Sequence, residues 1–406
     1  MNMPQPSIPL VCLAFSMMGS LSSVQAGDWP HWRGPDRNGI SQETDWDQTL
    51  GGGSPKVAWK AEVGIGFSSF VVSNGRVYTT GNADDQDSLF CLDAVTGKEV
   101  WKHSYPADLG AKFFEGGTTG TPTVSGGEVF QLSRWGDLFC FEAATGKVVW
   151  SKNVQEETDA RIPDWGFSGA PLIWEDLVIL NVGQSGAAFE NATGKLVWKS
   201  DEKTAGYSAP LPYEFDGKEA VLLGSSRAYL AVEARTGALL WEFPWRTSYG
   251  VNAADPVVHG GLVYISAGYN KGAALLKPAH SEPEVLWQNR DMRNQMNPPV
   301  LVDGYLYGVD GNDGKATFKC LEFSSGETQW EQDGIGSGSV IVAGGKLLIL
   351  SESGKLVVAN PNSNKFDSLA EAKILSGKCW TVPVLANGLL YARNAEGAVV
   401  CVDLRN

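Results

Sequence analysis

Histidine and paired cysteines are scarce in this chain of 406 residues. With four histidines, a metal site built mainly on imidazole ligands is not expected. Six cysteines occur, but no two are adjacent and none forms a Cys-x-x-Cys motif. The sequence also lacks Gly-x-Ser-x-Gly, His-Glu-x-x-His and a phosphate-binding loop. No short motif therefore points to a particular reaction.

Positive charge is also in short supply. The chain has 32 Lys and Arg against 46 Asp and Glu, which gives a formal net charge of −14. An acidic protein of this kind repels the phosphate backbone, so we expect no nucleic-acid partner. Beyond the N-terminus no stretch is long and apolar enough to cross a bilayer, so we expect no transmembrane segment in the mature chain.

The N-terminus is typical of a secretory signal peptide. Residues 8–21 are uncharged and largely apolar, and Val24-Gln25-Ala26 places small side chains at the −3 and −1 positions of a cleavage site. Residues 1–7 lack the usual Lys or Arg, which leaves a retained anchor or a misassigned start as the alternative. We predict a signal peptide at 1–26 and a soluble protein that is periplasmic or secreted.

Internal repetition is the strongest feature of the sequence. One unit runs from Cys91 to Trp101: a small residue, an acid two positions later, Thr-Gly, and Trp ten positions after the start. Further copies begin at Cys140, Ala188, Ala231 and Cys320. Together with two weaker copies they place tryptophans 42 to 49 residues apart, the length of a four-stranded propeller blade, at Trp59, Trp101, Trp150, Trp198, Trp241, Trp287 and Trp330.

Each position of the unit has a structural role. The glycine accepts positive φ at a tight turn, and the Thr and the acid bond the turn amides. The tryptophan buries a large surface against the neighbouring blade, although a stacking platform for a ligand is the alternative. Four of the five cysteines after residue 26 occupy the small-residue position, where Ala is the other choice. We therefore predict buried free thiols and no disulfide.

A count of hairpins predicts eight blades. Eight two-residue turns precede the repeats, at residues 74–75, 126–127, 175–176, 216–217, 260–261, 303–304, 344–345 and 387–388. One blade lacks its tryptophan, and we expect the vacant position near Ile374. The last blade lacks an outer strand, which the segment around Trp59 supplies. We predict an all-β, eight-bladed propeller over 57–406, an N-terminal extension over 27–56, and a monomer.

The repeat small-x-Asp-x-x-Thr-Gly-Lys-x-x-Trp resembles the tryptophan-docking repeat of quinoprotein (PQQ-like) eight-bladed propellers over residues 57–406. Residues 28–39 are similar to the leader of secreted PQQ-like repeat proteins. That superfamily includes dehydrogenases that use pyrroloquinoline quinone (PQQ) and also BamB, a non-enzymatic scaffold of outer-membrane protein assembly. Fold alone does not choose between the two.

Several departures from the dehydrogenases favour the scaffold. The resemblance implies an adjacent-cysteine disulfide over the quinone and long insertions in the propeller, and this chain has neither. We predict a BamB-like, non-catalytic binding module with no cofactor and a protein partner in the cell envelope. The main alternative is an oxidoreductase that acts on alcohols or sugars with PQQ and Ca²⁺. A third interpretation is polysaccharide binding through Trp135, Trp165 and Trp245.

Loops that lead into the innermost strands carry the candidate ligand site. Their Arg, Asp, amide and aromatic side chains suit an anionic planar ligand, although polar loops are also often merely solvated. The favoured interpretation assigns no catalytic or metal-binding residue; under the oxidoreductase alternative, Asp164 and Asp291 are candidates for a general base or a metal ligand. The full candidate set is Arg161, Asp164, Trp165, Arg246, Asn252, Asp291, Arg293, Asn297 and Trp380.

Overall fold

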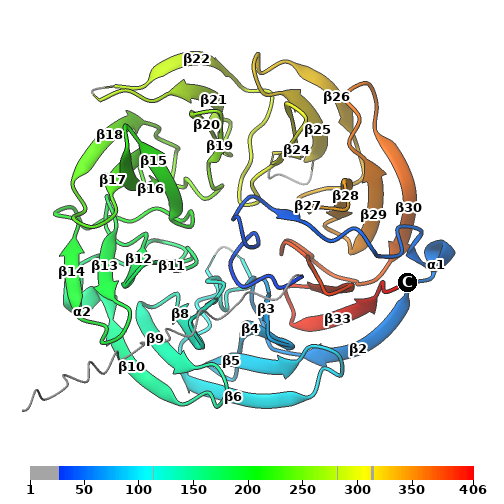
Figure 1. Cartoon of the computed structure of the whole chain (residues 1–406), viewed down its shortest axis with the longest axis horizontal. Helices are drawn as coiled ribbons and strands as arrows, with labels where there is room; N and C mark the ends of the chain where they lie inside the picture. The colour runs from blue at the N-terminus through cyan, green and yellow to red at the C-terminus, as the bar shows by residue number, and fades with distance from the viewer. Residues whose placement is uncertain (1–26, 113, 281, 312–314) are drawn as a thin grey trace, which may run out of the picture.

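Eight antiparallel sheets of four strands surround a central axis in the computed structural model (Figure 1), which confirms the eight-bladed propeller. The structure describes residues 27–406 except 113, 281 and 312–314. The predicted signal peptide at 1–26 lies outside the described residues. None of the helices in the described part of the chain has the length and apolar character needed to cross a membrane.

The first four blades follow one another along the chain. Blade 1 contains β3 (Val71–Ser73), β4 (Arg76–Ala83), β5 (Gln86–Asp93) and β6 (Glu99–Pro106). Blade 2 contains β7 (Thr123–Ser125), β8 (Glu128–Leu132), β9 (Asp137–Glu142) and β10 (Val148–Asn153), and helix α2 (Val154–Thr158) follows it. Blade 3 contains β11 (Leu172–Trp174), β12 (Leu177–Leu180), β13 (Ala187–Glu190) and β14 (Leu196–Lys199). Blade 4 contains β15 (Leu211–Phe215), β16 (Lys218–Gly224), β17 (Ala228–Glu233) and β18 (Leu239–Pro244).

The other four blades complete the ring. Blade 5 contains β19 (Val257–His259), β20 (Leu262–Ala267), β21 (Gly272–Lys277) and β22 (Glu284–Asn289). Blade 6 contains β23 (Val300–Val302), β24 (Tyr305–Asp310), β25 (Thr317–Glu322) and β26 (Thr328–Gln332). Blade 7 contains β27 (Ser339–Ala343), β28 (Lys346–Leu350), β29 (Lys355–Asn360) and β30 (Asp367–Lys373), with β1 (Ile40–Ser41) added beside β27. Blade 8 contains β31 (Val384–Ala386), β32 (Leu389–Arg393), β33 (Ala398–Asp403) and β2 (Lys56–Glu62).

The repeated tryptophans lie on the outermost strands and contact the next blade. Six of them donate the indole N–H to a backbone carbonyl of that blade at 2.7–3.0 Å: Trp59, Trp101, Trp150, Trp198, Trp287 and Trp330. Five rings also lie against the turn glycine of the next repeat, as Trp150 does against Gly194. Trp241 differs, since the indole nitrogen is buried without a hydrogen-bond partner. Six of the eight blades are thus hydrogen-bonded to the next blade through the tryptophan of the outer strand.

Blade 7 is the blade without a docking tryptophan. The strand register places Ala370, which pairs with Val358, in the tryptophan position, so the prediction that the gap lies near Ile374 was wrong by four residues. Helix α1 (Leu50–Gly53) packs against β30, and Trp46 and Leu50 join the core there. The N-terminal extension therefore covers the blade whose own side chain is small.

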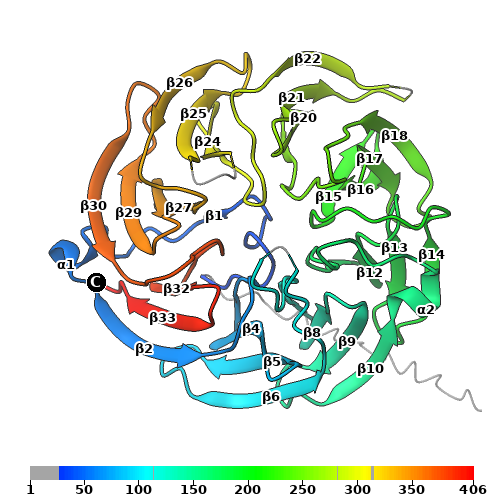
Figure 2. The ribbon, with the colours of Figure 1, turned by 180° about the vertical axis from the view of Figure 1, so that it is seen from behind.

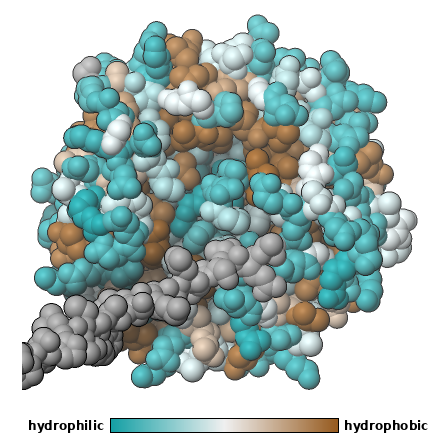
Figure 3. All heavy atoms as spheres, viewed as in Figure 1, coloured by the Kyte–Doolittle hydropathy of each residue, from teal (hydrophilic) through white to brown (hydrophobic). Residues whose placement is uncertain are grey.

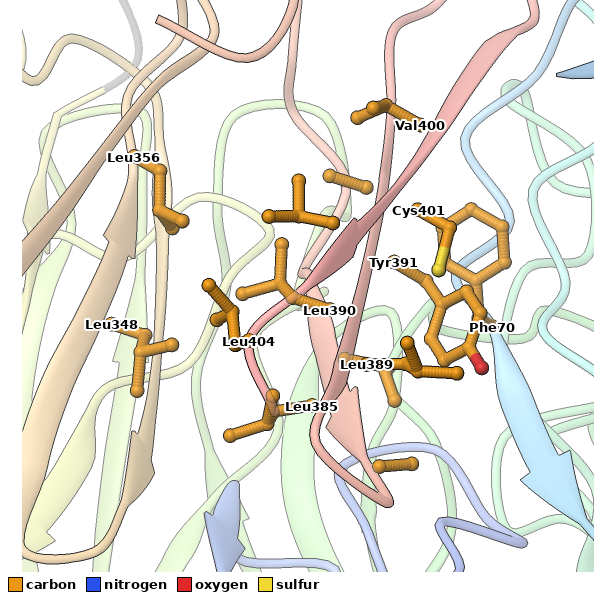
Figure 4. Close-up of a cluster of buried hydrophobic side chains, with 14 of the residues drawn as sticks. Phe70, Leu348, Leu356, Leu385, Leu389, Leu390, Tyr391, Val400, Cys401 and Leu404 are labelled. Atoms are coloured by element: carbon orange, nitrogen blue, oxygen red, sulfur yellow. The ribbon is translucent and has the colours of Figure 1, made fainter. Parts of the chain in front are cut away.

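Blade 8 closes the ring with strands from both ends of the described chain. β2 pairs antiparallel with β33, and Trp59 lies opposite Cys401. Five of the other repeat tryptophans likewise lie opposite Cys or Ala, and Trp287 lies opposite Leu275. In Figure 4, leucines of blade 7 and blade 8 and the Phe70 and Tyr391 rings gather in one apolar cluster at this closure. Cys91, Cys140, Cys320, Cys379 and Cys401 are all buried and free.

Residues 27–49, here called the strap, cross the centre of the ring. The backbone of this segment bonds to blade 1 at Val72, to blade 2 at Val124 and to blade 7 at Val342. Its dark blue trace occupies the middle of the propeller in both Figure 1 and Figure 2. Because the strap also contacts the hairpin turns at Asn74 and Asn387, it lies at the end of the channel opposite the loops that lead into the innermost strands.

Candidate functional site in the central funnel

A cavity of about 310 Å³ lies at the centre of the ring, among the loops that lead into the innermost strands. All eight blades contribute residues to it. Its walls are mainly aromatic, and the six wall aromatics are Phe67, Phe114, Trp165, Tyr207, Tyr269 and Trp380. In Figure 3 one face of the propeller is mostly polar, and apolar residues are exposed in patches between the polar ones, many of them above the centre of the view.

The floor of the cavity is formed by the strap. Trp32 of the strap lines the cavity and donates its indole N–H to Asp255 Oδ2 at 2.6 Å. The other oxygen, Oδ1, accepts the backbone N–H of Ala209 at 2.7 Å. Asp255 thus attaches the strap to blades 4 and 5, and the funnel ends at Trp32.

Buried charges surround this attachment. Burial raises the pKa of Asp255, while the positive charges of Arg33 and Arg37 act in the opposite direction. Burial also lowers the pKa of both Arg33 and Arg37 to about 10. Arg33 donates to the carbonyls of Asn38 and Pro299 at 2.9 and 2.7 Å. The pKa of His31 falls to about 3, because burial and the charge of Arg37 both disfavour a second proton.

Three of the nine predicted ligand residues line the cavity: Trp165, Asn297 and Trp380. Trp380 packs against Phe67 with 5.7 Å between ring centroids and donates to Glu352 Oε1 at 2.8 Å. Asn297 donates to the carbonyls of Gly338 and Trp380 at 3.0 and 2.9 Å. These contacts set the shape of the wall between blades 6, 7 and 8.

The other six predicted residues do not line the cavity. Exposed positions are occupied by Arg161, Asp164, Arg246 and Asp291. Arg293 forms a two-pronged pair with Asp310, with both N–O distances at 2.8 Å. Asn252 is fully buried and donates to the carbonyls of Ser225 and Trp245. The three arginines are therefore not brought together on one ligand.

Most residues that line the cavity were not predicted from the sequence. Phe67 and Tyr207 stand at equivalent positions, each between a Gly and a Ser in the loop that leads into the first strand of its blade, so the phase of the repeat marks them. Trp32 and Asp255 carry no such signal, because their contact joins positions 223 residues apart. Of the three tryptophans considered for polysaccharide binding, Trp245 is only 1% exposed.

The cavity does not suit PQQ held with Ca²⁺. PQQ carries three carboxyl groups, and such an anion needs positive or donor groups around it. Asp255 is the one charged residue among those described that line the cavity. Nor does any cluster of three or more His, Cys, Asp or Glu in the described part of the chain have the arrangement of a metal site. Neither an acidic nor a basic ligand set is therefore available in the lining.

Eight blades, seven of them with a docking tryptophan, around a blind aromatic funnel define a propeller of the PQQ-like repeat class. A family model described as outer membrane protein assembly factor BamB matches residues 43–119 and 108–332. The two matches together span well over half of the sequence, and the chain belongs to this family.

One curated relative and several solved structures are similar to the chain. Outer membrane protein assembly factor BamB of Marinobacter adhaerens is 25% identical over 147 residues. This alignment spans 34% of the chain and the same share, about a third, of the relative.

The structure of BamB from Moraxella catarrhalis superposes with a TM-score of 0.64 at 16% identity and covers 86% of this chain and 99% of that one. The quinohemoprotein alcohol dehydrogenase of Comamonas testosteroni gives 0.64 at 14% identity, over 94% of this chain and 81% of that one. A europium-containing methanol dehydrogenase gives 0.66 at 14% identity, over 91% and 90%. These structural likenesses show the shared fold alone, since scaffold and enzyme fit equally well.

Proposed function

We propose that this protein is an exported, non-catalytic binding module of the cell envelope, which holds a protein partner on the face that carries the funnel loops. The observation that supports a non-catalytic role is the state of Asp255. Both of its oxygens already accept hydrogen bonds from the fold, and the positive charges of two buried arginines act on it. A carboxylate tied to the fold through both oxygens is poorly placed to take a proton from a substrate, as a general base must.

The rim of the funnel supports the choice of face. Tyr249 is 61% exposed, and its ring lies 5.0 Å from that of Tyr269 and 6.2 Å from that of Trp165. Aromatic side chains of this kind are enriched in protein interfaces because they bury a large area at a small cost in conformational entropy. The family description, outer membrane protein assembly factor BamB, agrees with a partner in the envelope.

Photo-crosslinking in cells tests the scaffold role. A photoreactive amino acid in place of Tyr249 should give a discrete adduct with one envelope protein, identified by mass spectrometry. The matched control is the same replacement of Val197, which is 43% exposed on an outer strand. An adduct at Val197 but not at Tyr249 would contradict the chosen face, and no adduct at either position would contradict the scaffold role.

Calorimetric titration with PQQ, with and without Ca²⁺, tests the oxidoreductase alternative. We expect no heat of binding in either condition, because the lining lacks cationic groups for the carboxylates. One-to-one binding at micromolar or lower concentration, followed by dye reduction with alcohols or sugars, would replace the proposed function with the enzymatic one.

A further inference from the structure

The funnel cavity is large enough for a small molecule, and no side chain among the described residues fills it. Its volume of about 310 Å³ falls at the lower end of the range found for ligand pockets, roughly 300–1,000 Å³. Cavities lined by apolar side chains also tend to stay dry and to accept apolar guests. The chemistry of the lining then decides which class of molecule fits.

The charged side chains at the wall and rim of the cavity already have partners within the protein. Asp255 is bonded to Trp32 and to the Ala209 amide, as described above. At the rim, Lys378 is paired with Glu115 and lies 4.3 Å from the centre of the Trp380 ring. An ionic ligand would lose its hydration without meeting an opposite charge, and this loss is costly in a partly buried site. An uncharged ligand avoids that cost.

Several polar side chains of the lining are also engaged, although Gln295 Oε1 is buried without a hydrogen-bond partner. Thr119 donates to the Phe167 carbonyl at 3.0 Å, and Ser168 donates to the Tyr207 carbonyl at 3.0 Å. Thr381 makes the same kind of bond to the Phe67 carbonyl at 3.3 Å. A sugar, which presents a hydroxyl on nearly every carbon, would find few of these donors available. The lining therefore disfavours carbohydrate although it is rich in aromatic rings.

The remaining feature of the walls is their aromatic surface, contributed from several directions. Phe67 and Trp380 come from loops of blades 1 and 8, Trp165 from blade 3, and Tyr207 and Tyr269 from blades 4 and 5. Aromatic rings attract other flat rings through offset stacking and edge-to-face contacts. The charged side chains are paired, several donors are engaged, and aromatic rings line the walls. We therefore propose that the funnel binds one uncharged, planar aromatic molecule above Trp32.

Titration with N-phenyl-1-naphthylamine, a neutral aromatic probe that fluoresces in apolar surroundings, tests this site. We expect one-to-one binding at micromolar concentration in the full mature protein. Ala253→Trp places a large ring in the cavity and should raise the dissociation constant at least about tenfold. Ala238→Trp, at an exposed turn outside the cavity, is the matched control and should leave the affinity unchanged.

Two further ligands separate this proposal from its competitors. Cellohexaose and PQQ with Ca²⁺, titrated under the same conditions, should displace none of the probe. Displacement by either one, or unchanged probe affinity in Ala253→Trp, would overturn the proposal. If Ala253→Trp melts at a lower temperature than the parent, Trp380→Ala is measured instead, and an unchanged affinity there has the same meaning. The crosslinking result at Tyr249 is independent of these outcomes, so the two proposals fail separately.

Discussion

At the scale of single residues, the repeat works through the close approach of a tryptophan ring to a glycine. A Cβ at Gly194 would lie 2.6 Å from the Trp150 ring, and the same distance is 2.5 Å for Gly97 and Trp59. These glycines also have positive φ, near 68° at both positions. The residue is thus required twice, by the backbone conformation and by the neighbouring blade.

Two glycine variants separate these requirements. Gly194→Ala should destabilise the protein by at least about 3 kcal/mol, since the new methyl group collides with Trp150 and the backbone is strained as well. Gly217→Ala is the control, because its φ is 71° and a Cβ there meets nothing within 4 Å. It should cost only about 1 kcal/mol. Urea unfolding measures both, and equal costs would show that the ring contact is unimportant.

Asp87 makes stability depend on pH. Its side chain is fully buried in β5, Oδ1 accepts from Asn82 at 2.8 Å, and Oδ2 has no partner. Burial raises the pKa of Asp87 from 3.8 to about 6; the Asn82 hydrogen bond and Arg134 oppose the rise, and Asp137 adds to it. Between these two pH values the folded protein holds a proton that the unfolded chain has lost. Stability from this group therefore falls as the pH rises from about 4 to 6.

Replacement by asparagine tests this effect. Asp87→Asn should remove a difference on the order of 2 kcal/mol between pH 4 and pH 7, relative to the parent protein. Urea unfolding at the two pH values gives the comparison. An identical pH dependence in parent and variant would mean that Asp87 ionises normally in the folded state.

At the scale of elements, the strap is the part of the chain that the repeat does not explain. It adds β1 to blade 7 and closes the funnel with Trp32, and helix α1, which follows it, covers β30. Its two arginines, Arg33 and Arg37, are only 4% and 7% exposed. Arginines so deeply buried need a counter-charge, and Asp255 supplies it.

Removal of that counter-charge should release the strap. Asp255→Ala is expected to cost about 3–5 kcal/mol, because it leaves buried charge uncompensated. Trypsin should then cut after Arg33 or Arg37, which the parent protein protects. Asp164→Ala, at an exposed position beside the same funnel, is the control and should cost less than about 0.5 kcal/mol. A stable variant that resists trypsin would show that Asp255 does not anchor the strap.

At the scale of the whole molecule, closure of the ring couples the blades. β2 and β33 come from opposite ends of the described chain, and their pairing completes the four strands of blade 8. Each blade is then docked on both sides. Loss of any one blade would break two seams together, so we expect the propeller to unfold in one transition.

The five buried thiols report on this cooperativity. Cys91, Cys140, Cys320 and Cys401 lie in blades 1, 2, 6 and 8, and Cys379 lies in the loop before blade 8. In a urea series with an alkylating reagent, all five should become reactive at the same urea concentration. Because they are free, added reductant should leave the melting temperature unchanged. Earlier alkylation of Cys379 and Cys401 would indicate that the closing blade opens by itself.

The number of blades, the docking tryptophans and the closing strand could all be predicted from the sequence. Each of these rests on local spacing that recurs along the chain, such as the ten residues between Cys91 and Trp101. The sequence also indicated which loops surround the funnel, and Trp165, Asn297 and Trp380 do line it. These features can be predicted without a structure because the same spacing recurs in several copies of the repeat.

The chemistry of the funnel, in contrast, depends on contacts between residues that are far apart in the sequence. Arg293 pairs with Asp310 and does not line the cavity. Trp32 donates to Asp255, which lies 223 residues later in the sequence. The strap contains no copy of the repeat, so its position relative to the blades cannot be predicted from repeat spacing. Its composition does not indicate that it lies in the channel. Charge balance in the funnel depends on which groups the fold brings together, and single-chain spacing does not contain that information.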